Sequence, residues 1–168
     1  MKLLQTQGLS LHRGQRCLLR DLDLTIESGQ RWALLGRNGS GKSTLLKTLV
    51  GLDSTYQGEI WMGSEPLASL ASRQRAQAVG LVFQHSHVGF HNTALEMALS
   101  GSYAHPGQTW WDQPQQIATA QQALRDVDLE KQQQRSLASL SGGELRRCEI
   151  ARLLVQNPAL AMLDEPLN

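Results

Sequence analysis

The 168-residue chain has few cysteines, few aromatic side chains and little excess charge. Cys17 and Cys148 form neither a metal-binding spacing nor a disulfide framework, which is typical of a reducing compartment. The 16 Lys and Arg residues nearly balance the 15 Asp and Glu residues, so bulk charge does not indicate binding to nucleic acid. The apolar runs are far shorter than the ~20 residues that cross a bilayer, and the N-terminus lacks the apolar core of a signal peptide.

A glycine-rich motif with the sequence GRNGSGKST follows the apolar run at residues 32–35 and precedes a helical pattern that ends at Gly51. We predict a buried strand, a tight turn and a helix N-terminus, the context in which G-x-x-x-x-G-K-[ST] binds a nucleoside triphosphate. Lys42 would reach the β- and γ-phosphates and the Ser43 hydroxyl would bind Mg²⁺. A glycine turn without a ligand is the alternative. The predicted phosphate-binding residues are Gly36, Arg37, Asn38, Gly39, Ser40, Gly41, Lys42, Ser43 and Thr44.

A second motif, LSGGE at residues 140–144, stands directly before a helical pattern. Ser141 and Glu144 have the spacing of a capping box, so a well-capped helix is one explanation. A cap does not need the pair Gly142 and Gly143, and each glycine costs a helix about 1 kcal/mol. The pair therefore favours a helix N-terminus that a phosphate group approaches closely. The apolar face of this helix is predicted to contain Leu145, Cys148, Ala151, Leu154 and Val155.

A third motif consists of the apolar residues 160–163 followed by Asp164 and Glu165. It predicts a buried strand that carries two carboxylates at its C-terminal end, where open α/β sheets bind ligands. Asp164 would hold Mg²⁺ and Glu165 would polarise the water that attacks the γ-phosphate. Two acids in a surface turn before Pro166 are the alternative.

In this order and spacing, the three motifs resemble the nucleotide-binding domain of ABC transporters, and the resemblance covers residues 1–168. It implies an α/β P-loop fold with an N-terminal antiparallel β part, a mostly parallel core sheet and a helical subdomain. The catalytic core is expected at about residues 1–84 and 156–168, and the helical subdomain at about 85–155. Gln84 matches the family's Q-loop glutamine, which reaches Mg²⁺ and the nucleophilic water. His12 or Arg13 stands where the family has an aromatic residue that stacks on adenine.

The resemblance implies an ATPase subunit that uses ATP and Mg²⁺ to drive transport at the cytoplasmic face of a membrane. The implied partners are transmembrane permease subunits, a substrate-binding protein and a second ABC ATPase domain in a homodimer; nucleic acid is not among them. In that dimer Ser141, Gly142, Gly143 and Glu144 would bind the ATP held by the partner. Residues 93–106 partly resemble the ATPases of iron-siderophore, haem and cobalamin importers. A soluble ABC ATPase of DNA repair or translation, and a nucleotide-binding fragment without activity, are the alternatives.

The family's domain continues past the acidic strand with an Asp loop, a further strand and a switch histidine. That strand lies between the P-loop strand and the acidic strand, so we expect residues 1–168 to leave apolar surface uncovered and to be inactive alone. The complete domain is expected to have ~240 residues. His85, His87 and His91 have a spacing that allows a metal site, but an exposed loop that faces the membrane partner is favoured.

Overall fold

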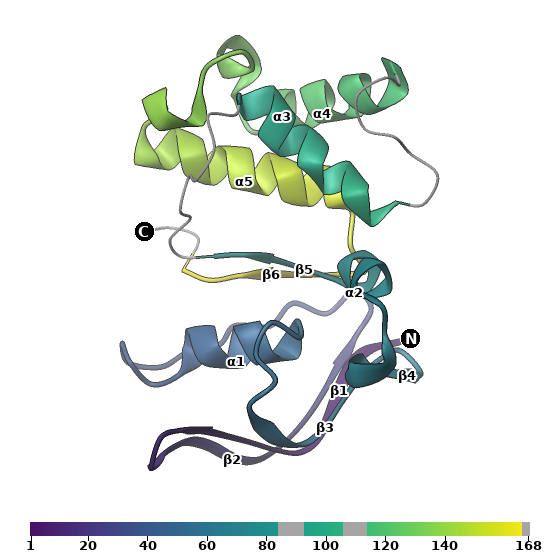
Figure 1. The fold of residues 1–168 in the computed structure, drawn as a ribbon, viewed down its shortest axis with the longest axis vertical. Coiled ribbons are helices and arrows are strands. Elements are labelled where there is room, and N and C mark those ends of the chain that lie inside the picture. Colours follow the sequence, from purple (N-terminus) through teal and green to yellow (C-terminus); the bar gives the residue numbers. More distant parts are fainter. Residues whose placement is uncertain (84–92, 106–113, 166–168) are drawn as a thin grey trace. The chain divides into compact units, whose positions relative to one another are not determined.

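The computed structural model describes residues 1–83, 93–105 and 114–165, and the chain forms two compact units. The first unit comprises Met1–Leu81 and Ala159–Asp164, and the second comprises Val82–Pro158 and Glu165–Asn168. Figure 1 traces the elements of both units along the chain. Each unit has its own secondary structure, mainly strands in the first and helices in the second.

The first unit contains an antiparallel sheet of four strands in the order β2-β1-β3-β4. These strands are β1 (Lys2–Arg13), β2 (Arg16–Glu27), β3 (Tyr56–Met62) and β4 (Glu65–Pro66). On β1, the buried residues are at even-numbered positions up to Thr6, but Leu9 and Leu11 are also buried. The pairing of β1 with both neighbouring strands shifts register in between. Such a bulge keeps Leu9 and Leu11 on the same buried face as Leu4 and Thr6.

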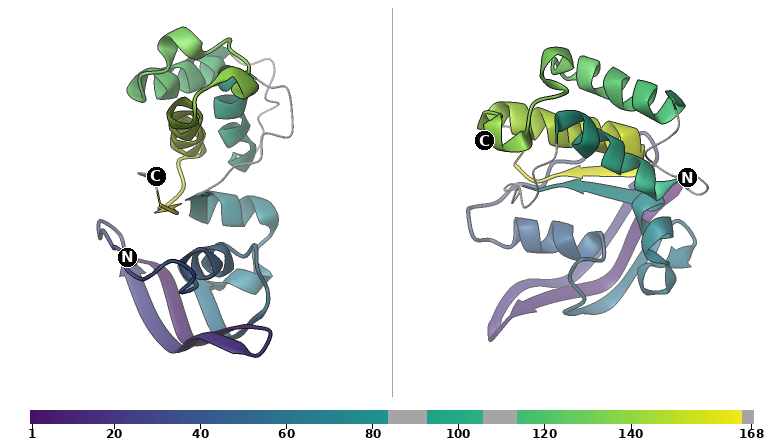
Figure 2. Two further views of the ribbon diagram at one scale, coloured as in Figure 1. Left: turned by 90° about the vertical axis from the view of Figure 1, so that its left-hand side faces the viewer. Right: turned by 45° about the horizontal axis from the view of Figure 1, so that its top comes forward.

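Helix α1 (Lys42–Leu49) lies on one side of this sheet, as Figures 1 and 2 show. Its buried residues are Leu45, Thr48 and Leu49, which recur at helical spacing. The 3₁₀ turn η1 (Leu67–Ser69) and helix α2 (Ser72–Ala78) follow the sheet. Strands β5 (Val79–Val82) and β6 (Leu160–Leu163) pair in a small parallel sheet, and β6 ends directly before Asp164.

The prediction of a buried strand at residues 32–35 is wrong for this structure. The segment belongs to no strand, and Trp32, Leu34 and Leu35 are 59%, 47% and 88% exposed. A strand needs a neighbour that satisfies its backbone hydrogen bonds, and within the described residues none pairs with this segment. The strand predicted at residues 160–163 is present as β6, but its prediction as a buried strand is wrong, because only Met162 is buried and Leu163 is 44% exposed. The pairing of β6 with β5 alone leaves the rest of this strand uncovered within the described residues.

The second unit is helical. It contains α3 (Ala94–Leu99), the 3₁₀ turn η2 (Ser100–Ala104), α4 (Pro114–Asp126), the turns η3 (Glu130–Gln132) and η4 (Leu137–Ser139), and α5 (Gly142–Gln156). Helix α5 lies alongside α3 and α4 in Figures 1 and 2. Cys148 is fully buried in their shared core, as predicted, whereas Leu154 is 48% exposed and does not belong to the buried face. None of the helices in the described ranges combines the length and the apolarity that a bilayer crossing needs.

The backbone of η2 passes very close to α5. A Cβ atom at Gly101 would lie 2.3 Å from the Arg152 carbonyl oxygen and 2.8 Å from the Gln156 nitrogen. Because both are backbone atoms of a helix, they cannot turn away from an added methyl group as a flexible side chain can. We therefore expect Gly101→Ala in the complete protein to lower the free energy of unfolding by about 1–3 kcal/mol, as overpacking does.

Urea unfolding followed by circular dichroism measures this loss. Gly142→Ala is the matched control, because no atom of residues 1–83, 93–105 or 114–165 outside its own helix turn lies within 4 Å of the Cβ position at Gly142. A Gly101→Ala protein as stable as the control would contradict the close approach of η2 to α5.

Candidate nucleotide-binding site

The glycine-rich motif forms a turn that leads directly into α1. Gly41 is the N-cap of the helix with a φ of 102°, and the Leu45 amide donates to its carbonyl at 2.8 Å. The Cβ position at Gly41 also lies 3.3 Å from Cβ of Leu18 on β2. Both the left-handed backbone and this contact favour glycine. The N-cap residue Gly41 therefore offers no side chain to the first N–H groups of α1, which suits an anion-binding helix N-terminus.

The side chain of Lys42 lies over this turn. Its Nζ donates to the carbonyl oxygen of Gly36 at 2.9 Å and to that of Arg37 at 3.2 Å. An ammonium group within reach of the turn and of the helix N-terminus is suited to bind phosphate oxygens. The geometry thus brings together the glycine turn, the lysine and the start of α1, as the motif predicts.

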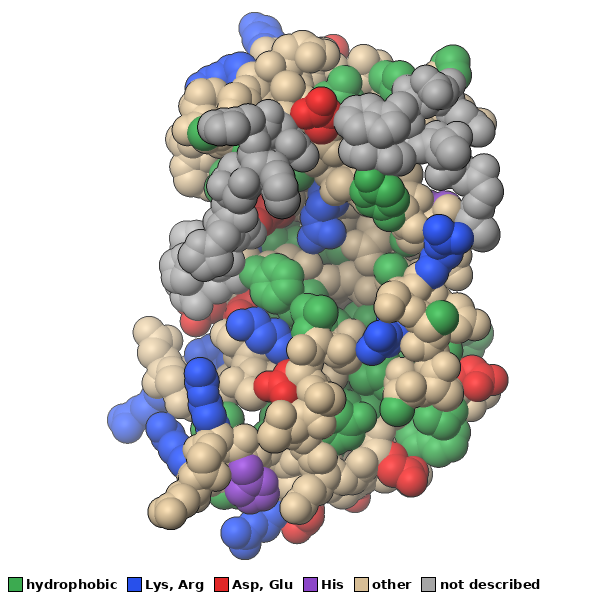
Figure 3. Space-filling view, in the orientation of Figure 1, with side chains coloured by type: hydrophobic (Ala, Val, Ile, Leu, Met, Phe, Trp, Pro, Cys, Tyr) green, Lys and Arg blue, Asp and Glu red, His purple; other side chains and the backbone are tan. Residues whose placement is uncertain are grey.

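Basic side chains of the β1–β2 hairpin lie near this turn. In Figure 3, Lys and Arg side chains gather over the hairpin and the adjoining end of α1, at the lower left of the view. Arg13 pairs directly with Arg16, and His12 pairs with Cys17. Both His12 and Arg13 are exposed at the end of β1.

Asp164 follows β6 in the first unit and is 5% exposed. Its carboxylate and the Ser43 hydroxyl, in the first turn of α1, are hard oxygen donors of the kind that Mg²⁺ prefers, so the donor set fits the implied metal. Glu165 is a non-glycine residue with a φ of 48°. Such backbone strain clusters at functional sites. Gln84, and the histidines at 85, 87 and 91, lie outside the described residues.

The LSGGE motif forms the N-terminus of α5. The Ser141 hydroxyl accepts from the Glu144 amide at 3.2 Å, and the Glu144 carboxylate accepts from the Ser141 amide at 2.8 Å. The capping box is therefore confirmed. The hydrogen bond from the Ser141 amide is the main cause that lowers the pKa of Glu144, with Arg135, at 3.6 Å, adding a smaller attraction.

Gly142 and Gly143 are not required by the fold around them. Neither has a positive φ. Among the described residues, no heavy atom lies within 4 Å of the Cβ position at Gly142, and the nearest one at Gly143 is Nη1 of Arg147 at 3.9 Å. An alanine at either position would fit the chain and favour the helix. Nothing in the described parts of the chain therefore requires glycine at these two positions.

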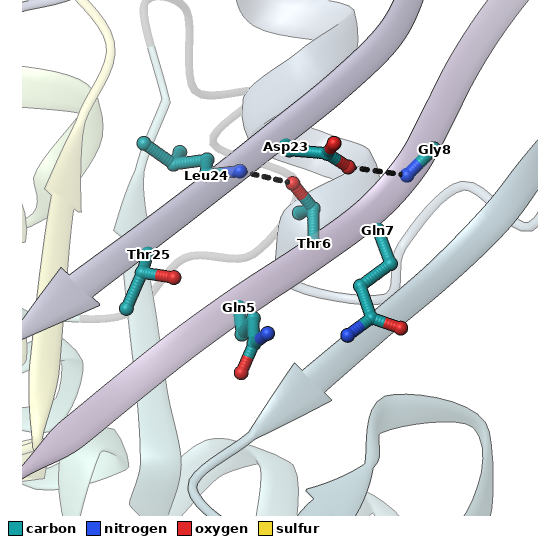
Figure 4. Close-up of a pocket in the computed structure, with 7 residues that line it drawn as sticks. All are labelled: Gln5, Thr6, Gln7, Gly8, Asp23, Leu24 and Thr25. Carbon is teal, nitrogen blue, oxygen red and sulfur yellow. Dashed lines mark hydrogen bonds between the residues drawn. The ribbon is translucent and has the colours of Figure 1, made fainter.

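A separate hollow of about 580 Å³ lies on the sheet of the first unit, as Figure 4 shows. The Gly8 amide donates to the Asp23 carboxylate at 2.7 Å, and the Thr6 hydroxyl accepts from the Leu24 amide at 3.0 Å. These polar groups serve the bulge in β1, so the hollow is a consequence of sheet geometry. None of the predicted site residues is among its lining, which consists of Gln5, Thr6, Gln7, Gly8, Asp23, Leu24 and Thr25.

The structure also shows contacts that the sequence motifs do not reveal. Arg146 of α5 is buried, forms an ion pair with Glu149 and donates to the carbonyl oxygen of Phe83. In the first unit, Arg75 donates to the Gly51 carbonyl at 3.2 Å, just past the C-terminus of α1. The sequence offers only the i, i+3 spacing of Arg146 and Glu149 as a signal, and that spacing is common on helix surfaces.

The glycine turn at the start of α1, its lysine and the strand that ends in acidic residues define a P-loop nucleotide-binding protein. The chain belongs to the ABC transporter family, because a family model described as ABC transporter matches residues 19–168. The predicted family and the predicted fold class are thus confirmed.

Curated relatives cover nearly the whole chain. The hemin import ATP-binding protein HmuV of Myxococcus xanthus is 37% identical over 98% of this chain and 58% of its own length. The lipoprotein-releasing system ATP-binding protein LolD of Pseudomonas fluorescens is 40% identical over 89% of this chain and 66% of its own length. The aliphatic sulfonates import ATP-binding protein SsuB 2 of Pseudomonas aeruginosa is 36% identical over 98% of this chain and 55% of its own length. The chain therefore spans less than two thirds of these relatives.

Solved structures agree on the fold. A metal-chelate type ABC transporter in an inward-facing conformation is 30% identical, with a TM-score of 0.79, over 98% of this chain and 60% of that one. The ADP conformation of the ATP-binding cassette MJ1267 has a TM-score of 0.81 over 99% of this chain and 70% of that one. At 24% identity the second likeness supports the fold alone.

Proposed function

We propose that the complete protein is the ATP-binding subunit of an ABC transporter and hydrolyses ATP to drive transport. The observation that carries this proposal is the pair Gly142 and Gly143 at the capped N-terminus of α5, because no contact with a described residue requires glycine there. Bare N–H groups in the first turn of a helix bind phosphate. A second phosphate-binding turn besides that of Lys42 fits a dimer in which each ATP lies between two protomers.

The proposed roles follow from the chemistry of the side chains. The turn at residues 36–44 holds the phosphates, with Lys42 facing the β- and γ-phosphates. Ser43 and Asp164, with Gln84, would hold Mg²⁺, which when bound neutralises charge that develops on the phosphates. Glu165 acts as the general base that takes a proton from the attacking water.

Of the two candidates for contact with the adenine base, we propose Arg13. It is exposed at the end of β1, and Leu18 on the neighbouring strand β2 lies 3.3 Å, at its Cβ, from the Cβ position of the P-loop residue Gly41. A planar guanidinium stacks on an aromatic ring system, and unlike an aromatic residue it adds a positive charge near the nucleotide.

We further propose that the partners are permease subunits, a substrate-binding protein and a second copy of the ATPase domain, at the cytoplasmic face of the membrane. We propose that the transporter imports an iron chelate, haem or cobalamin. The partial match of residues 93–106 supports it, as do the names of the hemin importer and the metal-chelate transporter. Other relatives of similar identity are named for lipoprotein release and for sulfonate import, so similarity to relatives does not by itself identify the cargo.

Gly143→Ala in the complete protein tests the second phosphate-binding turn. We expect the variant to be as stable as the wild type or more stable by up to about 1 kcal/mol, because alanine favours a helix. Its ATP turnover should fall by about tenfold or more, since a methyl group then stands where a phosphate approaches the N–H groups. Thermal unfolding and steady-state phosphate release measure the two effects.

Binding of a fluorescent ATP analogue to the monomer serves as the control. It should be unchanged, because the first phosphate-binding turn is intact. Wild-type turnover in the Gly143→Ala protein would show that the pair of glycines has no part in ATP hydrolysis.

A further inference from the structure

Helix α5 has a buried charged pair in addition to its apolar face. Arg146 is 9% exposed and Glu149 is 4% exposed, and Nη1 of Arg146 lies 3.1 Å from Oε2 of Glu149. The same Nη1 donates to the carbonyl oxygen of Phe83, which directly follows β5. Phe83 and α5 belong to the same compact unit. One side chain therefore joins the first turns of α5 to a distant point of the chain.

Stability alone is a weak explanation for this pair. Removing two charges from water costs free energy that their attraction often only offsets, and apolar residues of similar volume frequently serve as well. Burial raises the pKa of Glu149, while the hydrogen bond from Arg146 opposes that rise. The carboxylate thus fixes the direction of the Arg146 guanidinium, and the guanidinium in turn fixes the Phe83 carbonyl.

The two ends of this connection adjoin two parts of the predicted site. Phe83 immediately precedes Gln84, which is expected to reach the Mg²⁺ and the water of the ATP bound to the same protomer. Arg146 lies one helical turn past Gly142 and Gly143, which are proposed to bind the partner's ATP. Arg146 therefore gives these two ends a direct hydrogen-bonded connection.

We propose that Arg146, oriented by Glu149, is a positioning residue that couples the two ATP sites of the dimer by tying the chain at Phe83 to the N-terminal turn of α5. The coupling between ATP sites rests on the proposed function, whereas the hydrogen-bonded connection from Arg146 to Phe83, here called the tie, does not. Loss of the tie should reduce the cooperativity of ATP hydrolysis and leave the affinity of the P-loop for nucleotide unchanged.

Two double variants of the complete protein, assembled with its permease, distinguish a coupling role of Arg146 from a role in stability alone. Arg146→Met with Glu149→Leu removes both charges and retains apolar volume, so no buried ion is left without a partner. Arg146→Glu with Glu149→Arg keeps an ion pair on the helix but places a carboxylate, which cannot donate, beside the Phe83 carbonyl. Arg125→Met on α4 is the matched control, because Arg125 is exposed.

Three measurements decide the outcome: the ATP dependence of hydrolysis, the affinity for a fluorescent ATP analogue, and hydrogen exchange at residues 81–83 and 142–145. In both double variants we expect the Hill coefficient to fall to about 1, with unchanged affinity. Amide exchange at the two segments should rise by about tenfold. The Arg125→Met protein should behave as the wild type does.

Cooperative hydrolysis and slow exchange in both double variants would overturn the proposal. Recovery of both properties by the charge-swapped variant alone would also overturn it, since the ion pair and not the contact with Phe83 would then matter. A wild-type transporter that hydrolyses no ATP would instead refute the proposed function. The exchange measurement would still decide whether Arg146 ties the two segments together.

Discussion

Lys42→Ala in the complete protein is expected to lower ATP turnover by about a hundredfold or more. The Nζ atom lies at the carbonyl oxygens of Gly36 and Arg37, beside the first turn of α1. A cation in this place stabilises the charge that gathers on the phosphate oxygens in the transition state, and groups of this kind contribute several kcal/mol. Steady-state phosphate release with saturating ATP and Mg²⁺ measures the loss.

Lys47→Ala is the matched control, because Lys47 is an exposed lysine in the last turn of the same helix. This variant should retain most of the wild-type turnover. If Lys42→Ala kept more than about a tenth of the wild-type rate, the lysine would contribute far less than a phosphate clamp does, and the assignment of the P-loop would be wrong.

Glu165→Gln is expected to separate ATP binding from ATP hydrolysis. Glutamine keeps the size and the hydrogen-bonding capacity of the side chain but loses the carboxylate that accepts a proton from water. Turnover should therefore fall by about a hundredfold, the lower end of the range for loss of a general base, while ATP still binds. If the proposed dimer opens only after hydrolysis, the variant should accumulate as an ATP-bound dimer.

Size-exclusion chromatography with and without Mg-ATP detects this dimer. Asp164→Asn provides a comparison, since the loss of a predicted Mg²⁺ ligand should weaken binding of Mg-ATP as well as turnover. A Glu165→Gln protein that hydrolyses ATP at the wild-type rate would remove Glu165 from the role of general base. The strained backbone at this residue would then need another explanation.

The parts of the structure that depend on local sequence were predictable. Ser141 and Glu144 form the predicted capping box because both partners lie within one turn of helix. Gly41 begins α1 where the motif requires a left-handed residue. Cys148 is buried because its position on the helix, relative to Ala151 and Val155, already defines an apolar face.

Features that depend on distant partners were not predictable. The apolar run at residues 32–35 has the composition of a buried strand, but strand formation needs a neighbour that the sequence of the run does not specify. Helix α2 has no buried residue and hence no apolar periodicity by which it could be found. The contact of Arg146 with Phe83 joins residues 63 positions apart, and only the fold brings them together.

The position of Lys42 over the P-loop carbonyls also has a kinetic consequence. Its two hydrogen bonds fix the ammonium group and the turn relative to each other. An incoming phosphate has only to take the place of the carbonyl oxygens of Gly36 and Arg37, so capture requires no folding of the loop. The rate of nucleotide association should then depend on diffusion and on the electrostatic attraction between basic side chains and the polyanionic phosphates. Because salt screens this attraction, the association rate should fall as the salt concentration rises.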